Sequence, residues 1–232
     1  MPRSLATLLQ HPAIRLGSGV ALRAHPTQSS GFPQLDAVLP HGGWPLGAVS
    51  ELLLPQPGSG ELTLLLPLLA SLTGQGRRVY LLQPPALPYA PAWAAAGVNL
   101  QQVYWLALHD ERQGLWSGEQ ILREPGNAWL GWFDKAPTDK SCRRLQLAAE
   151  QGGGLGLLLR QAQPAGGGTP FGLRLALTPA PSGVRVRILK RRGPPLESPI
   201  LINRPAEAVK QGWQPAGAVS PADRAATVPA ED

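Results

Sequence analysis

The sequence has very few of the residues that build disulfides and metal sites. It contains one cysteine, Cys142, and four histidines at widely separated positions. One cysteine cannot form a disulfide within the chain, which favours a reducing cytoplasm. The histidines show neither metal-site spacing nor a nearby paired carboxylate or nucleophile. We therefore expect no metal, no metal catalysis and no histidine acting as a general acid or base.

Long hydrophobic runs are also missing. The longest candidate, LTLLLPLLASL at 62–72, has about half of the roughly 20 residues that cross a bilayer, and Pro67 interrupts it. The first residues lack an apolar run followed by a small-residue cleavage site, so no secretory signal is expected. These features predict a cytoplasmic protein.

Acidic residues are scarcer than basic ones, and this shapes the expected partners. Asp and Glu number 15 against 21 Lys and Arg, a formal net charge of +6. A basic balance points to anionic partners, most often nucleic acid. Hydrophobic residues make up 43% of the 232 residues, enough for one domain with a sizeable core.

The composition divides the chain into three segments. Residues 1–30 are expected to form a short helix, around 4–12, followed by a loose arm. Residues 31–203 carry the apolar patterns of a globular domain. Residues 204–232 are rich in Ala, Pro, Gly and charge, which is typical of a disordered tail.

The globular segment alternates short apolar runs with helical patterns. AVSELLL at 48–54 reads as a buried strand, PQPGSG as a turn, and the sequence from Glu61 to Gly74 as a helix that ends on glycine. The alternation continues with strands at 77–83, 103–108, 128–133 and 155–161 and helices at 90–96, 116–124 and 140–152. This order predicts an α/β fold with a mostly parallel sheet and helices on its faces. Two alternating runs within 171–192, joined by PAPSG, predict a C-terminal β-hairpin.

The turn after the first strand lies where a phosphate-binding loop is expected. That loop, G-x-x-x-x-G-K-[ST], needs a Lys for the phosphates and a hydroxyl for Mg²⁺. Here Glu61 and Leu62 hold those positions, and two like charges about 4 Å apart repel by roughly 4 kcal/mol at an effective dielectric of 20. ATP hydrolysis is not expected, although Thr63 could substitute poorly for the hydroxyl. The residues of this degenerate nucleotide loop are Gly58, Ser59, Gly60, Glu61 and Leu62.

Two explanations of the loop remain open. It is an ordinary strand-to-helix turn in which Glu61 lies at the positive end of the helix dipole, or it is inherited from a nucleotide-binding ancestor. A nucleophilic role for Ser59 is not expected, because the sequence names no base for it.

The run SSGFPQLDAVLPHGGWPLGAVSELLLPQPGSGELTLLLPLLA resembles the core of RecA-type recombinases, in which a Gly-x-x-x-Leu-Asp element and a Gly-Gly turn precede the nucleotide loop. In recombinases the next strand ends in an acidic residue that activates water, but here Gln83, Pro84 and Pro85 stand there. Recombinases also have an Asp that closes the strand matching AWLGWF. Here Asp134 corresponds to it, displaced by one position. The resemblance therefore implies a pseudo-ATPase without a nucleotide cofactor.

Four further stretches resemble the ImuA family of translesion-synthesis accessory proteins: GGWPLGAVSELL, LPYAPAWAAAGVNL, LWSGEQILR and RRLQLAAEQGG. The likeness covers roughly residues 5–203. It implies a role in SOS mutagenesis beside ImuB, an inactive relative of Y-family polymerases, and an error-prone replicative-type polymerase. RecA itself and DNA are further candidate partners, which implies association with the nucleoid when engaged.

Basic residues gather in the predicted hairpin. They would neutralise phosphates in a salt-dependent, sequence-independent way, or they are ordinary surface charge. By resemblance to recombinases, Lys190 and Arg192 could instead mark an old subunit interface. The candidate DNA or partner contacts are Arg174, Arg185, Arg187, Lys190, Arg191 and Arg192, and the first three are expected to face solvent.

Tryptophan is frequent for a chain with few other aromatics. Trp44 follows a Gly-Gly turn and Trp213 lies in the polar tail, so both are candidate anchors for a partner. The other tryptophans lie in apolar patterns and are expected in the core: Trp93, Trp105, Trp116, Trp129 and Trp132.

These observations predict a non-enzymatic adaptor in damage-induced DNA synthesis. Two alternatives remain: a divergent DNA-dependent ATPase of the RecA class, and an inhibitor of cell division resembling SulA, which shares the fold.

Overall fold

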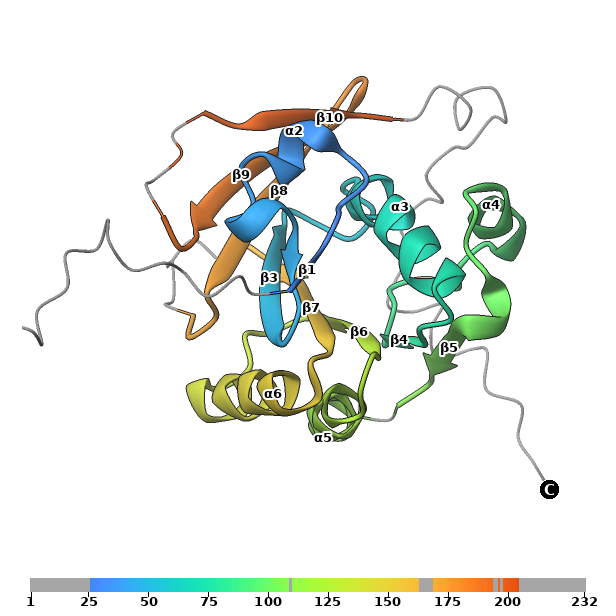
Figure 1. Ribbon diagram of the computed structural model, residues 1–232, viewed down its shortest axis with the longest axis vertical. Coiled ribbons are helices and arrows are strands. Elements are labelled where there is room, and N and C mark those ends of the chain that lie inside the picture. Colours follow the sequence, from blue (N-terminus) through green and yellow to red (C-terminus); the bar gives the residue numbers. More distant parts are fainter. Residues whose placement is uncertain (1–25, 109, 163–168, 194–195, 197, 205–232) are drawn as a thin grey trace, which may run out of the picture.

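The chain forms a three-layer α/β structure around one large sheet (Figure 1). This computed structural model describes residues 26–108, 110–162, 169–193, 196 and 198–204. The eight strands lie in the order β10-β9-β8-β3-β7-β6-β4-β5. Their bounds are β3 (Ala48–Leu54), β4 (Val79–Leu82), β5 (Val103–Leu106), β6 (Ala128–Phe133), β7 (Leu155–Gln161), β8 (Leu173–Ala180), β9 (Gly183–Lys190) and β10 (Ile200–Asn203).

The strands from β8 to β5 in this order run parallel, and the hairpin side of the sheet is antiparallel. β3 pairs with both β7 and β8 in parallel, whereas β9 pairs antiparallel with β8 and with β10. A separate two-stranded sheet joins β1 (Thr27–Gln28) to β2 (Trp44–Pro45). The predicted α/β fold with a mostly parallel sheet and a C-terminal hairpin is confirmed.

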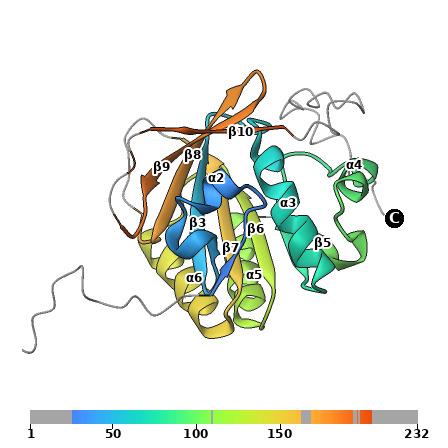
Figure 2. The same cartoon turned by 45° about the horizontal axis from the view of Figure 1, so that its top comes forward.

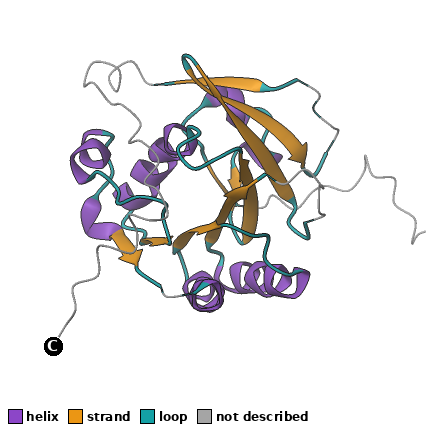
Figure 3. Cartoon of the chain, turned by 180° about the vertical axis from the view of Figure 1, so that it is seen from behind, coloured by secondary structure: helices purple, strands orange, loops and turns teal. Residues whose placement is uncertain are grey.

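Helices cover both faces of the parallel strands. α3 (Glu61–Gly74) lies on one face, and α5 (Glu111–Arg123) and α6 (Asp139–Gly152) lie side by side on the other (Figure 3). Short helical elements complete the fold: α2 (Pro33–Asp36), η1 (Pro40–Gly42), α4 (Ala90–Ala95) and η2 (Leu100–Gln102). Because both faces are covered, the central strands read as nearly continuous apolar runs.

Each face of the sheet has its own apolar cluster. On the α3 side, the helix contributes five leucines with no exposed surface: Leu64, Leu65, Leu68, Leu69 and Leu72. On the α5–α6 side, Trp129 and Phe133 of β6 pack with Leu122 and Leu145. The hydrophobic core is therefore divided by the sheet, and residues on one strand alternate between the two clusters.

The two long helices on the second face have side-chain caps at their starts. Oδ1 of Asp110 accepts from the Gln113 N–H at 2.7 Å at the start of α5, and Oγ1 of Thr138 accepts from the Ser141 N–H at 3.2 Å at the start of α6. α6 is followed by Gly153, whose φ of 66° is the left-handed value that favours glycine.

Several element boundaries differ from the prediction. α5 begins at Glu111, five residues before the predicted start at 116, because Asp110 caps the helix there. β10 adds a strand that the sequence did not indicate, just before the predicted tail. The predicted helix around 4–12 and the tail beyond Arg204 lie outside the described residues.

Among the described residues, no helix has the length and apolar character needed to cross a membrane.

Candidate functional site

The turn between β3 and α3 spans residues 55–60 at the carboxyl end of a central strand. Gly58 and Gly60 have φ values of 81° and 100°, which favour glycine. A Cβ on Gly60 would also lie 2.9 Å from Cβ of Val184 on β9. The turn is therefore held close to the hairpin, and glycine is required there by both backbone angle and space.

The side chain of Glu61 folds back into this turn. Its Oε1 accepts a hydrogen bond from the Gly58 N–H at 2.8 Å, and the residue is only 3% exposed. The Ser59 hydroxyl donates to the Gln56 carbonyl and accepts from the Gln56 N–H, and Ser59 is 1% exposed. The turn thus pairs the Ser59 hydroxyl and the Gly58 N–H, which already contacts a carboxylate. Oε2 of Glu61 is buried without a hydrogen-bond partner among the described residues.

The remaining parts of a nucleotide site are not assembled around the turn. Leu62, at the position of the Mg²⁺ hydroxyl, packs against the α3-side cluster. Gln83 stands half-buried at the end of β4 with φ of 50°, and Asp134 after β6 is exposed. Within the described residues, no group of three or more His, Cys, Asp or Glu is placed to hold a metal ion.

A buried ion-pair network crosses three strands beside the turn. Oε1 of Glu51 on β3 lies 2.6 Å from Nε of Arg160 on β7, and its Oε2 lies 2.9 Å from Nε of Arg174 on β8. The Arg160 and Glu51 side chains are each 4% exposed and Arg174 is 12% exposed. The prediction that Arg174 faces solvent is wrong, because the register pairs it directly with Glu51. The lone glutamate inside an apolar strand was the sequence signal for this network.

Two arginines of β9 do face solvent. Val184, Val186 and Ile188 turn into the α3-side cluster, so the alternate residues Arg185 and Arg187 lie on the opposite, exposed face of the hairpin. Figure 2 shows β8 and β9 at the edge of the molecule away from β5.

The other basic residues of the hairpin end make local contacts. Nζ of Lys190 donates to the Thr169 carbonyl at 2.7 Å. Arg191 donates to the Val38 carbonyl, which ties the end of β9 to the segment after α2. Arg192 is exposed and also interacts with another residue. The predicted basic stripe is therefore divided into two outward arginines and a structural group.

The tryptophans differ most from the sequence prediction. Trp44 has no exposed surface, because it lies in β2 and packs in the α3-side cluster, so its interpretation as an exposed anchor is wrong. Trp105 on β5 and Trp116 on α5 are 51% and 59% exposed, so their predicted core positions are also wrong. Trp213 lies outside the described residues.

Trp116 borders a hollow between α5 and α6 that the sequence did not reveal. The hollow has a volume of about 490 Å³, and its charged lining includes Arg112, Glu119 and Arg144. Glu119 is 2% exposed and its Oε2 lies 2.8 Å from a terminal nitrogen of Arg144, so the acid beneath the hollow is paired. Tryptophan is among the residues enriched in binding hot spots.

Cys142, on the inner side of α6, is not a reactive thiol. Burial raises its pKa to about 11, and the charge of Glu51 acts in the same direction. The thiol therefore stays protonated near neutral pH.

Comparison with known proteins relates the sequence of this chain to a family. No family profile matches the chain. Two curated relatives, each named protein ImuA and from two strains of Caulobacter vibrioides, are 31% identical over 173 residues, which cover 68% of this chain and 70% of each relative. With that identity and coverage, the chain belongs to the ImuA family.

Proposed function

We propose that this chain is a non-enzymatic adaptor of SOS-induced mutagenic translesion synthesis, acting in the ImuA and ImuB mutagenesis system. It would connect an ImuB-type polymerase relative with an error-prone replicative-type polymerase near damaged DNA, with RecA as a further candidate partner. Membership of the ImuA family supports a role in this mutagenesis system. While bound to its partners at damaged DNA, the protein would be associated with the nucleoid.

The observation that carries the non-enzymatic part is the position of Glu61. Its carboxylate accepts from Gly58 N–H and is almost fully buried in the loop. A nucleotide phosphate approaching the same N–H would meet a negative charge and would have to displace it. The side chain that fills the loop thus stands against ATP binding.

The exposed features suit recruitment. Trp116 beside the α5–α6 hollow provides an aromatic anchor for a protein partner, and aromatic residues dominate binding hot spots. Arg185 and Arg187 offer two cations to DNA phosphates or to an acidic partner surface.

Calorimetric titration of ATP with Mg²⁺ tests the pseudo-ATPase part. We expect no binding heat for the wild-type chain, and measurable heat only if the double variant Glu61→Lys, Leu62→Thr restores the phosphate and metal contacts. A Glu61→Gln variant is the matched control, since it removes the charge without adding a lysine. Micromolar binding by the wild type would overturn this part and support the divergent DNA-dependent ATPase.

Affinity capture with purified candidates tests the adaptor part. We expect the chain to bind the ImuB-type protein, and Trp116→Ala to weaken binding by about tenfold or more. Leu147→Ala on α6 is the control, because Leu147 is also exposed, at 55%, but does not line the hollow. Binding to the tubulin-like division protein instead would favour the SulA-like alternative.

A further inference from the structure

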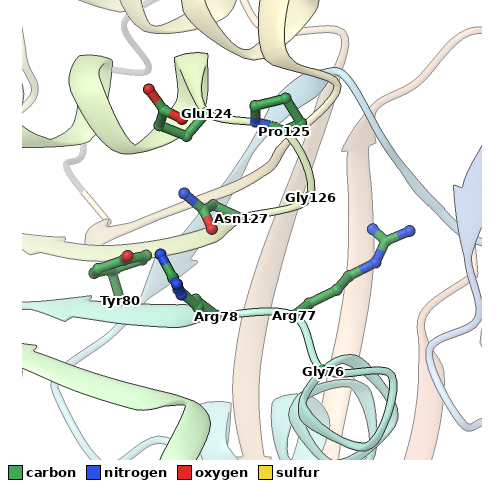
Figure 4. Close-up of a pocket in the computed structure, with 8 residues that line it drawn as sticks. All are labelled: Gly76, Arg77, Arg78, Tyr80, Glu124, Pro125, Gly126 and Asn127. Carbon is green, nitrogen blue, oxygen red and sulfur yellow. The ribbon is translucent and has the colours of Figure 1, made fainter.

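A cleft lies at the amino ends of β4 and β6, at the opposite end of these strands from the degenerate nucleotide loop. It has a volume of about 440 Å³ and is formed by two turns, 76–78 after α3 and 124–127 after α5 (Figure 4). The Ala128 N–H donates to the Arg78 carbonyl at 2.8 Å, which holds the turns together. None of the functions considered above uses this cleft.

The cleft carries cations that the fold does not neutralise. Arg78 is exposed and Arg77 is half-buried, and neither is ion-paired within the described part of the chain. Figure 4 shows Arg77 and Arg78 pointing to different sides, with the Arg78 guanidinium beside the ring of Tyr80. Glu124 stands exposed on the rim, so it reduces the positive charge without removing it.

Beside Arg78 is a pair of stacked aromatic rings. Tyr80 on β4 and Tyr104 on β5 are registered directly across the two strands, with ring centroids 5.1 Å apart and planes 22° from parallel. Tyr104 is 40% exposed, and β5 is the last strand of the sheet. Because no described strand lies beyond β5, no further strand side chain continues the stack beyond Tyr104.

A guanidinium next to a stacked, exposed aromatic pair suits single-stranded nucleic acid, which offers both phosphates and unpaired bases. Proteins bind single-stranded nucleic acid by stacking bases on aromatic rings while basic side chains hold the phosphates. A duplex keeps its bases stacked on one another and would use only the cations. An acidic peptide without aromatic residues would pair with the cations but would have no planar ring to stack on the open face of Tyr104.

We propose that Arg78, Tyr80 and Tyr104 form a binding site for single-stranded nucleic acid. Tyr104 stacks on an unpaired base, Tyr80 supports that ring from beneath, and Arg78 contacts the adjacent phosphate. The site goes beyond the proposed function, because it does not depend on any protein partner or on the β9 arginines.

Fluorescence anisotropy with a labelled oligothymidine of about 15 nucleotides tests the site. We expect Tyr104→Ala and Arg78→Ala each to weaken binding by roughly tenfold, and Tyr104→Phe to bind like the wild type because it keeps the ring. Glu124→Ala should strengthen binding, since it removes a negative charge from the rim. Thermal unfolding of each variant is the control for folding, and each should melt at nearly the wild-type temperature.

A second measurement locates the stacked base directly. An oligonucleotide with 5-iododeoxyuridine, irradiated on the wild-type chain, should crosslink to Tyr104, and Arg185→Ala with Arg187→Ala should leave that crosslink in place. The inference is overturned if the single strand does not bind, if the Tyr104 and Arg78 variants bind like the wild type, or if the crosslink maps elsewhere. Failure of ATP or partner binding would leave these results unchanged, so the two proposals fail separately.

Discussion

At the residue scale, the most consequential single position is Glu51, a carboxylate between two arginines inside the sheet. Arg160 and Arg174 both need its charge, because each is largely removed from water.

Glu51→Gln should therefore lower the free energy of unfolding by about 3 kcal/mol, since it removes the carboxylate that pairs with the buried Arg160 guanidinium and with Arg174. Glu150→Gln on the exposed side of α6 is the matched control and should change stability by less than about 0.5 kcal/mol. Denaturant unfolding measures both. Equal stability of the two variants would show that the network does not stabilise the fold.

The thiol of Cys142 gives a pH-dependent prediction at the same scale. Its pKa is raised by burial from 9.0 to about 11 in the folded chain, so the folded state favours the protonated form. The resulting stability is fully present below about pH 9 and is lost as the pH rises towards 11. We expect the melting temperature of the wild type to fall more steeply between pH 9 and 11 than that of Cys142→Ala. Parallel melting curves for the two proteins would contradict this.

At the element scale, the fold was predicted by segments that have a regular hydrophobic pattern and Gly or Pro turns at their ends. The apolar runs at 48–54, 128–133 and 155–161 became central strands, because a strand covered on both faces must be apolar throughout. Glycine and proline turns fixed their ends. The hairpin was equally readable, since its alternation has period two.

The errors arose where position in the sheet, not local sequence, decides burial. Trp105 looks like a core residue, but β5 is an edge strand, so half of its indole is exposed. Trp116 lies on α5, yet on its outer side. Trp44 follows two glycines, but β2 carries it into the core. Arg174 alternates as an outward residue would, but its neighbour Glu51 draws it into an ion pair.

The candidate site was predictable only in part. The sequence identified the degenerate loop by its motif, but not that Glu61 turns into it, because a motif gives residue types and not rotamers. The Tyr80–Tyr104 stack joins residues from different strands, and only the register of β4 with β5 brings them together.

β10 is one of the elements that the sequence missed, together with the β1–β2 pair, and it can be tested directly. Ile202 has no exposed surface and packs in the α3-side cluster, whereas its neighbour Leu201 is 41% exposed. Ile202→Ala should lower the free energy of unfolding by about 2–4 kcal/mol, because it leaves a cavity in the core. Leu201→Ala, a control with a similar loss of volume, should change it by about 0.5 kcal/mol or less. Similar small effects for both would mean that β10 does not belong to the folded domain.

At the scale of the whole molecule, the two basic surfaces lie on strands well apart in the sheet. Arg185 and Arg187 project from β9, while Arg78 precedes β4, five strand positions away in the sheet order. At roughly 4.8 Å between neighbouring strands, the two surfaces are separated by about 24 Å. A nucleic acid held at one surface therefore does not automatically contact the other.

The salt dependence of binding distinguishes local contact at β9 from the effect of net charge. Arg185→Ala with Arg187→Ala lowers the formal charge of the whole chain from +6 to +4, and so does Lys140→Ala with Arg143→Ala on the exposed face of α6. If the β9 pair contacts phosphates, its removal should reduce the slope of log affinity against log salt for duplex DNA by about 1.8, because each phosphate contact contributes about 0.9. If the duplex contacts β9 alone, the α6 pair should leave that slope almost unchanged, because it makes no phosphate contact. Equal reductions for the two double variants would mean that the hairpin acts only through the overall charge, and DNA contact by β9 would then be rejected.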